Sequence, residues 1–114
     1  MESNQQNFKT DSGKPNPLLL EVGCPRALLA VIQVLNYGAM KYEPNGWQDM
    51  DMELYNAAAR RHRIARDMGE ERDIESGLLH LAHEAANLLF QLETKCREMD
   101  EFRSLTMHDL ALEN

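Results

Sequence analysis

Residues 77–92 of this 114-residue chain read GLLHLAHEAANLLFQL, and this stretch decides the fold. It is apolar nearly all round, as expected for a helix in the core of an all-α domain. At 100° per residue its polar side chains fall within an arc of roughly 100°. They are His80, His83, Glu84, Asn87 and Gln91. We expect this stripe to be buried, and buried imidazoles and carboxylates need partners.

The segment before this helix is rich in acidic residues. It carries Glu70, Glu71, Asp73 and Glu75. Part of this pattern is explained by a solvated loop whose negative charges interact favourably with the dipole of the next helix at its N-terminal end. Carboxylates next to two histidines also predict a metal site. Its candidate ligands are Glu70, Asp73, Glu75, His80, His83 and Glu84. The alternative role for the two histidines is a buried hydrogen-bond network that sets the helix register.

Two more helices are predicted upstream from capping and periodicity. Pro25 suits the first turn of a helix that runs to about Lys41. Its apolar stripe contains Leu28, Ile32, Leu35 and Ala39. After a Pro-Asn-Gly turn, Asp51 can cap a second helix that ends near Met68, with Gly69 as its stop.

The third helix is expected to begin at a cap, either Asp73 or Ser76, and to continue to about Met99. No stretch of useful length alternates like a β-strand. The sequence therefore predicts an all-α fold, a small helical bundle of three to five helices. We expect residues 1–16 to form a flexible arm, 17–100 a single catalytic domain, and 101–114 a tail that can form a short helix.

Several properties of the whole chain bound its class. The net charge is −7 and the 12 Lys and Arg residues are spread out except between Arg60 and Arg66, which argues against binding long nucleic acid. No segment is long and apolar enough to span a membrane, and the N-terminus lacks a signal-peptide core. Cys24 and Cys96 fit neither a metal motif nor a disulfide framework, so we expect a reducing, cytoplasmic location.

The third helix has more apolar surface than two short neighbours can cover. We therefore expect the bundle to be completed by oligomerisation, as a homodimer or homotetramer.

The second helix carries the chain's basic cluster. Its predicted inner face consists of Leu54, Ala57, Ala58, Ile64, Ala65 and Met68, with Arg61 at the centre. An inward arginine either pairs with a buried carboxylate or holds a phosphate with its planar guanidinium. The outer face, with Asn56, Arg60, Arg63 and Asp67, is interpreted as solvated. His62 flanks the inner face, where a lone histidine is more often a core residue than a ligand.

Several short motifs now point to a family. They are Lys14-Pro15, Tyr37-Gly-Ala-x-Lys-Tyr42 followed by Trp47, Arg61-His62, Gly69-Glu70, Asp73, Glu75-Ser-Gly77, and His80-Leu-Ala-His83 with Asn87. In these motifs the chain resembles the phage and bacterial dATP/dGTP diphosphohydrolases, which are related to the MazG-like all-α nucleoside triphosphate pyrophosphohydrolases. The resemblance covers residues 14–92, and its block from Arg61 to Asn87 is the specific part.

The resemblance implies metal-dependent hydrolysis of a deoxynucleoside triphosphate, with a preference for dATP or dGTP, to the monophosphate and pyrophosphate. It implies that Arg61 and His62 are catalytic. The expected phosphate-binding residues are Lys14, Lys41 and Arg61, and the expected base-binding residues are Tyr42, Trp47 and Asn87. The cofactor is expected to be Mg²⁺ or Mn²⁺, with Co²⁺ or Fe²⁺ an option if an imidazole coordinates.

The chain also departs from its relatives. MazG proteins carry E-x-x-E on one helix and E-x-x-D on the next, whereas here the first motif is absent from the second helix and the nearest match to the second is Glu84-x-x-Asn87. The metal ligands therefore cannot be copied from MazG. Gly46 also stands where the family commonly has an asparagine before the tryptophan. Two other functions stay open: a non-catalytic helical interaction protein, and a metallohydrolase acting on another phosphate ester.

Overall fold

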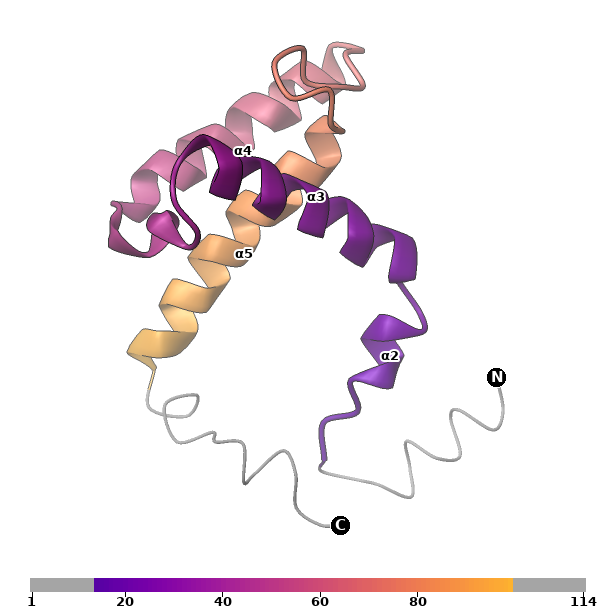
Figure 1. The fold of residues 1–114 in the computed structure, drawn as a ribbon, viewed down its shortest axis with the longest axis vertical. Helices are drawn as coiled ribbons and strands as arrows, with labels where there is room; N and C mark the ends of the chain where they lie inside the picture. Colours follow the sequence, from indigo (N-terminus) through magenta and orange to yellow (C-terminus); the bar gives the residue numbers. More distant parts are fainter. Residues whose placement is uncertain (1–13, 100–114) are drawn as a thin grey trace.

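The computed structural model describes residues 14–99, and within them the fold is all-α, as predicted (Figure 1). Its elements are α2 (Leu18–Glu21), α3 (Pro25–Lys41), a 3₁₀ turn η1 (Gly46–Asp49), α4 (Met52–Asp67) and α5 (His80–Glu98). No helix in this part of the chain is long and apolar enough to cross a membrane. The arm up to residue 13 and the tail over residues 101–114 lie outside the described residues.

Local signals set three helix boundaries as predicted. Pro25 is the first residue of α3. The side chain of Asp51 accepts a hydrogen bond from the backbone N–H of Glu53 and caps α4. Gly69 adopts φ +100°, a conformation that favours glycine, directly after α4 ends. Each signal acts within a few residues, so the sequence alone was enough to place it.

The predicted start of the last helix was wrong. Neither Asp73 nor Ser76 caps α5, which begins at His80. Gly77 has φ +75°, so the backbone turns before the helix can form. The carboxylate of Asp73 instead accepts the backbone N–H of Ser76 at 2.8 Å and closes a turn inside the loop.

The three long helices form a small bundle. α4 (magenta) and α5 (orange) lie side by side and antiparallel, α3 (purple) crosses α5, and α2 projects away from them (Figure 1). The buried core combines Val34 of α3 with Ala82 and Ala86 of α5. No large side chain of the described residues is fully buried, so the hydrophobic core of one copy is small.

The predicted inner face of α4 was also wrong. The side of α4 packed on α5 carries Tyr55, Ala59, His62 and Arg66, whereas the apolar residues Leu54, Ile64 and Met68 are 52%, 58% and 82% exposed. α4 meets the polar stripe of α5, so polar and aromatic groups serve better there than leucine. The predicted apolar stripe of α3 likewise remains largely exposed at Ile32 and Leu35.

Candidate active site

A tight loop, residues 69–79, connects α4 to α5 and carries acidic side chains to the histidines. The backbone of Asp73 donates to the carbonyl of Leu78 at 2.8 Å, and that of His80 donates to the carbonyl of Glu71 at 3.0 Å. These two bonds fold the loop back over the first turn of α5. They fix Asp73 and Glu70 beside the polar stripe, so the loop is a structural part of the site.

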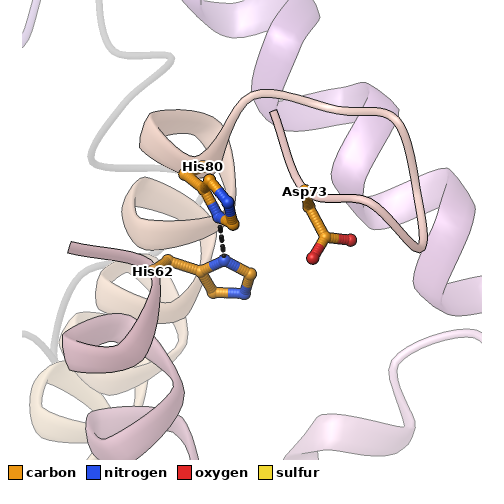
Figure 2. Close-up of side chains that lie close together, drawn as sticks. All are labelled: His62, Asp73 and His80. Carbon is orange, nitrogen blue, oxygen red and sulfur yellow. Dashed lines mark hydrogen bonds between the residues drawn. The ribbon is translucent and has the colours of Figure 1, made fainter. Parts of the chain in front are cut away.

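Three histidines from two helices meet under this loop. Nδ1 of His62 on α4 lies 2.8 Å from Nδ1 of His80 on α5. The ring of His62 also stacks on that of His83, with centroids 4.4 Å apart and planes within 7°. His80 and His83 are buried, as the stripe predicted. Figure 2 shows His62 and His80 joined by their hydrogen bond, with Asp73 beside them on the loop.

Each buried histidine is held by a second group. Nε2 of His80 lies 2.6 Å from a carboxylate oxygen of Glu70. Nε2 of His83 lies 2.7 Å from the hydroxyl of Ser76 and 4.0 Å from Asp73. Because Ser76 and Asp73 approach the same ring nitrogen, these three residues do not form a nucleophilic triad, in which the acid binds the other nitrogen.

Burial and charge decide the ionisation of this cluster. Burial lowers the pKa of His62, and the neighbouring His83 and His80 lower it further. Burial also lowers the pKa of His83. For Asp73, burial alone would raise the pKa, but hydrogen bonds from Ser76 and the nearby His83 outweigh it and lower the pKa overall. At neutral pH the site therefore combines the neutral imidazoles of His62 and His83 with the charged carboxylate of Asp73.

This combination fits a divalent cation. One potential ligand atom from each of His62, Asp73 and His80 lies within 4.8 Å of the others. Neutral imidazoles and an ionised carboxylate are the protonation states in which these side chains bind metal. Two nitrogens and one oxygen suit first-row transition ions better than the all-oxygen environment that Mg²⁺ prefers.

An open groove of about 1580 Å³ runs from this cluster between α3, η1, α4 and α5. It gathers most of the residues that the sequence singled out. Those that line it are Lys41, Tyr42, Trp47, Arg61, His62, Asp73, Glu75, His83 and Asn87. Arg61 keeps its place here although its helix face was mispredicted, and its guanidinium makes no hydrogen bond or ion pair within residues 14–99.

At the groove wall, α3 meets the loop through Glu75. Its carboxylate accepts hydrogen bonds from the hydroxyl of Tyr37 at 2.7 Å and from the ammonium of Lys41. These bonds, that of Lys41 first, lower the pKa of Glu75, and the same contact raises that of Lys41. The ammonium also lies 5.3 Å from the ring centroid of Tyr42. Glu75 thus neutralises the lysine that we expected to bind phosphate.

The aromatic residues of the groove differ in availability. Tyr42 is 71% exposed. Trp47 stacks on Phe90, with centroids 4.6 Å apart, and the guanidinium of Arg97 lies 5.8 Å from its ring centroid. Asn87 is buried and donates to the backbone carbonyl of His83 at 2.7 Å. Of the three expected base-binding side chains, Tyr42 is therefore the most accessible.

Two candidate residues lie away from the histidines. Glu84 accepts a hydrogen bond from Arg66 at 2.9 Å and lies 3.8 Å from Arg63, so it links α5 to α4. Lys14 precedes α2 and is not part of the groove wall. Sequence reasoning missed the link from Ser76 to His83 and that from Tyr37 to Glu75. The spacing of Tyr37 and Lys41 by one helical turn was the available signal for the second link.

Comparisons with known proteins now identify the family. The family model of the dATP/dGTP diphosphohydrolase N-terminal domain matches residues 4–103. The chain belongs to this family. A similar curated protein, the dATP/dGTP diphosphohydrolase of Salmonella phage PMBT28, is 35% identical over 83 residues. The match spans 73% of this chain and 28% of that relative, so the chain corresponds to less than a third of it. No solved structure matches the chain.

Proposed function

We propose that this chain hydrolyses a purine deoxynucleoside triphosphate, dATP or dGTP, to the monophosphate and pyrophosphate with the help of a divalent cation. Membership of the dATP/dGTP diphosphohydrolase N-terminal domain family supports the substrate class. One observation carries the proposal. A single groove joins a cluster of histidines and Asp73 to the guanidinium of Arg61, which has no hydrogen-bond or ion-pair partner within residues 14–99, and to the exposed aromatic ring of Tyr42.

The proposed reaction is attack of water on the α-phosphorus. A bond forms between the water oxygen and that phosphorus, and the bond to the oxygen that bridges to the β-phosphorus breaks. Pyrophosphate leaves with the electron pair, and the protons of the attacking water pass to solvent. A divalent cation held by His62, Asp73 and His80 would offset phosphate charge and lower the pKa of water.

The protein's own cations position the triphosphate. Arg61 offers a planar guanidinium that can make two parallel bonds to a phosphate group. Lys41 is held by Glu75, so it reaches a phosphate only by exchanging one anionic partner for another. Lys14 is not part of the groove wall, so its role as a further phosphate-binding candidate rests on the family resemblance.

The base is expected to stack in the part of the groove formed by the turn after α3. Tyr42 offers an open ring face there, and stacking on an aromatic ring favours the larger purine over a pyrimidine. Trp47 already packs on Phe90, so it supports the wall, and Asn87 lies deeper in the groove.

A substrate panel tests the function. The metal-stripped chain is incubated with the four deoxynucleoside triphosphates, the ribonucleotides and a set of phosphate monoesters, each with Mg²⁺ and with Mn²⁺, and the products are separated by ion exchange. We expect monophosphate and pyrophosphate from dATP and dGTP, with ¹⁸O from labelled water in the monophosphate. Hydrolysis of monoesters alone would favour the other metallohydrolase, and no turnover with any substrate would favour a non-catalytic protein.

We also propose that a second copy of this chain covers the outer side of α5. Leu81 and Leu88 lie two helical turns apart there and are 53% and 51% exposed, and neither lines the groove. A helix that buries its polar stripe and exposes its leucines is stabilised when a like apolar face packs against it. The expected assembly is a homodimer or homotetramer.

A further inference from the structure

The hydrogen bond between Glu70 and His80 determines which nitrogen of His80 carries the proton. His80 is 3% exposed, and its Nε2 lies 2.6 Å from a carboxylate oxygen of Glu70. An ionised carboxylate only accepts hydrogen bonds, so the proton of the ring sits on Nε2. The Nδ1 atom of a neutral His80 then carries a bare lone pair.

That lone pair is directed toward His62. Nδ1 of His80 lies 2.8 Å from Nδ1 of His62, which donates its proton to it in the absence of a cation. The three residues together offer ligand atoms within 4.8 Å of one another, from α4, the loop and α5 (Figure 2). Glu70 itself is not part of this compact set, although it belongs to the same loop as Asp73.

We propose that His62, Asp73 and His80 bind a first-row transition ion such as Mn²⁺ or Co²⁺ in preference to Mg²⁺, and that Glu70 is a positioning residue that keeps Nδ1 of His80 free for the ion. The proposal deepens the proposed function, because it concerns the same groove. A carboxylate on the distal nitrogen of a metal-binding histidine fixes the ring and raises its basicity. Two imidazole ligands favour transition ions over Mg²⁺.

The metal alone is the first probe. The full chain is stripped with a chelator and titrated by calorimetry with Mn²⁺, Co²⁺ and Mg²⁺ without any nucleotide. We expect one site per chain for Mn²⁺ and Co²⁺ and at least ~100-fold weaker binding of Mg²⁺. Equal or tighter binding of Mg²⁺ would overturn the assigned ligand set. Because no nucleotide is present, absence of hydrolysis and absence of metal binding are separate results.

Variants separate ligands from the positioning residue. Asp73→Asn and His80→Gln are each expected to abolish Co²⁺ binding, and agreement between them guards against the failure of one variant to fold. Glu84→Gln is the matched control, because Glu84 is a carboxylate of α5 that pairs with Arg66 instead. We expect its Co²⁺ affinity to equal that of the wild type. Loss of binding in this control, or wild-type binding in Asp73→Asn, would overturn the ligand set.

Glu70 needs a series of its own. Glu70→Ala is expected to weaken Co²⁺ binding by ~10- to 100-fold, and Glu70→Gln to restore most of it, because an amide oxygen still accepts the Nε2 proton. Nitrogen NMR of the metal-free chain should place the His80 proton on Nε2 in the wild type and lose that preference in Glu70→Ala. If Glu70→Gln abolishes binding as fully as Asp73→Asn, Glu70 is a ligand and the positioning role is wrong.

Discussion

The two sides of α5 differ in a way that reverses the usual pattern of a helix in a small domain. The side covered by α4 and the loop carries His80, His83 and Asn87, whereas the side that residues 14–99 leave uncovered carries Leu81 and Leu88. Buried polar groups are costly unless they are paired, and here they are paired with Glu70, Ser76 and the backbone carbonyl of His83. The single copy thus buries the polar groups of the candidate site, and its exposed leucines form the side that we propose for association.

We expect the largest effect from the loss of the Asp73 carboxylate on the covered side of α5. Asp73→Asn keeps the size of the side chain but removes the charge that a cation needs, so we expect dATP and dGTP turnover to fall by at least ~100-fold. The fold should persist, because the amide oxygen still accepts the Ser76 N–H that closes the loop. Steady-state kinetics and circular dichroism measure the two quantities. Wild-type turnover would remove Asp73 from the site.

We expect the second-largest effect from replacing the exposed leucines on the other side of α5. Burial of a leucine contributes ~1.5–3 kcal/mol, so replacing two leucines by charged residues should weaken association by at least ~100-fold. We expect the double variant Leu81→Glu, Leu88→Glu to sediment as a monomer at concentrations where we expect the wild type to form a dimer or tetramer. Gln48→Glu in η1 adds a charge without removing a leucine and should leave assembly unchanged. A double variant that still assembles would place the interface elsewhere.

We expect a smaller effect from a change of Arg61, which tests the role of the groove. Lysine keeps the charge of Arg61 but not its planar pair of donors, so Arg61→Lys should lower kcat/KM by about 10-fold, with the fold and assembly unchanged. Arg60→Lys is the matched control, because Arg60 is exposed, bonds to Asn56 and does not line the groove. If both variants have equal kinetics, Arg61 does not hold the triphosphate.

The sequence was sufficient where a signal is local. Pro25, Asp51 and Gly69 act on their own few residues, and each marked a helix end correctly. The start of α5 failed because the turn at Gly77 depends on how the loop folds back on the helix. An apolar pattern on a helix also predicts which face avoids water, but it does not tell what packs against that face. The face of α4 around Leu54 and Ile64 was mispredicted because the other side of α4, with His62 and Arg66, packs on the polar stripe of α5.

The candidate site was predictable in part. The stripe on α5 and the acidic segment indicated His80, His83 and Asp73 from composition and spacing. The contact between His62 and His80 joins residues 18 positions apart on different helices, and no periodicity reports such a pairing. The same holds for the pairing of Glu84 with Arg66, which takes that carboxylate away from the histidines.

We expect the smallest effect from the contact between Glu75 and Lys41, which tests whether the loop contributes to stability as well as to the candidate site. The hydrogen bond from Lys41 lowers the pKa of Glu75 below its ordinary value of 4.5, so this carboxylate stabilises the fold above that pH and ceases to do so as the pH falls through its lowered pKa. The raised pKa of Lys41 leaves its contribution intact up to its ordinary 10.5. Both side chains are exposed, so the stabilisation is small.

We therefore expect Glu75→Gln to lower Tm by about 2 °C at pH 7, and this difference should shrink as the pH falls through the lowered pKa of Glu75, because both proteins then carry a neutral side chain at this position. Scanning calorimetry of the metal-free chain from pH 3 to 8 measures it. Glu98→Gln is the control, because Glu98 meets Lys95 at 3.7 Å on the far end of α5, away from the groove. A Tm difference that does not shrink toward the acid end of the scan would mean that Glu75 acts through its packing and not through its charge.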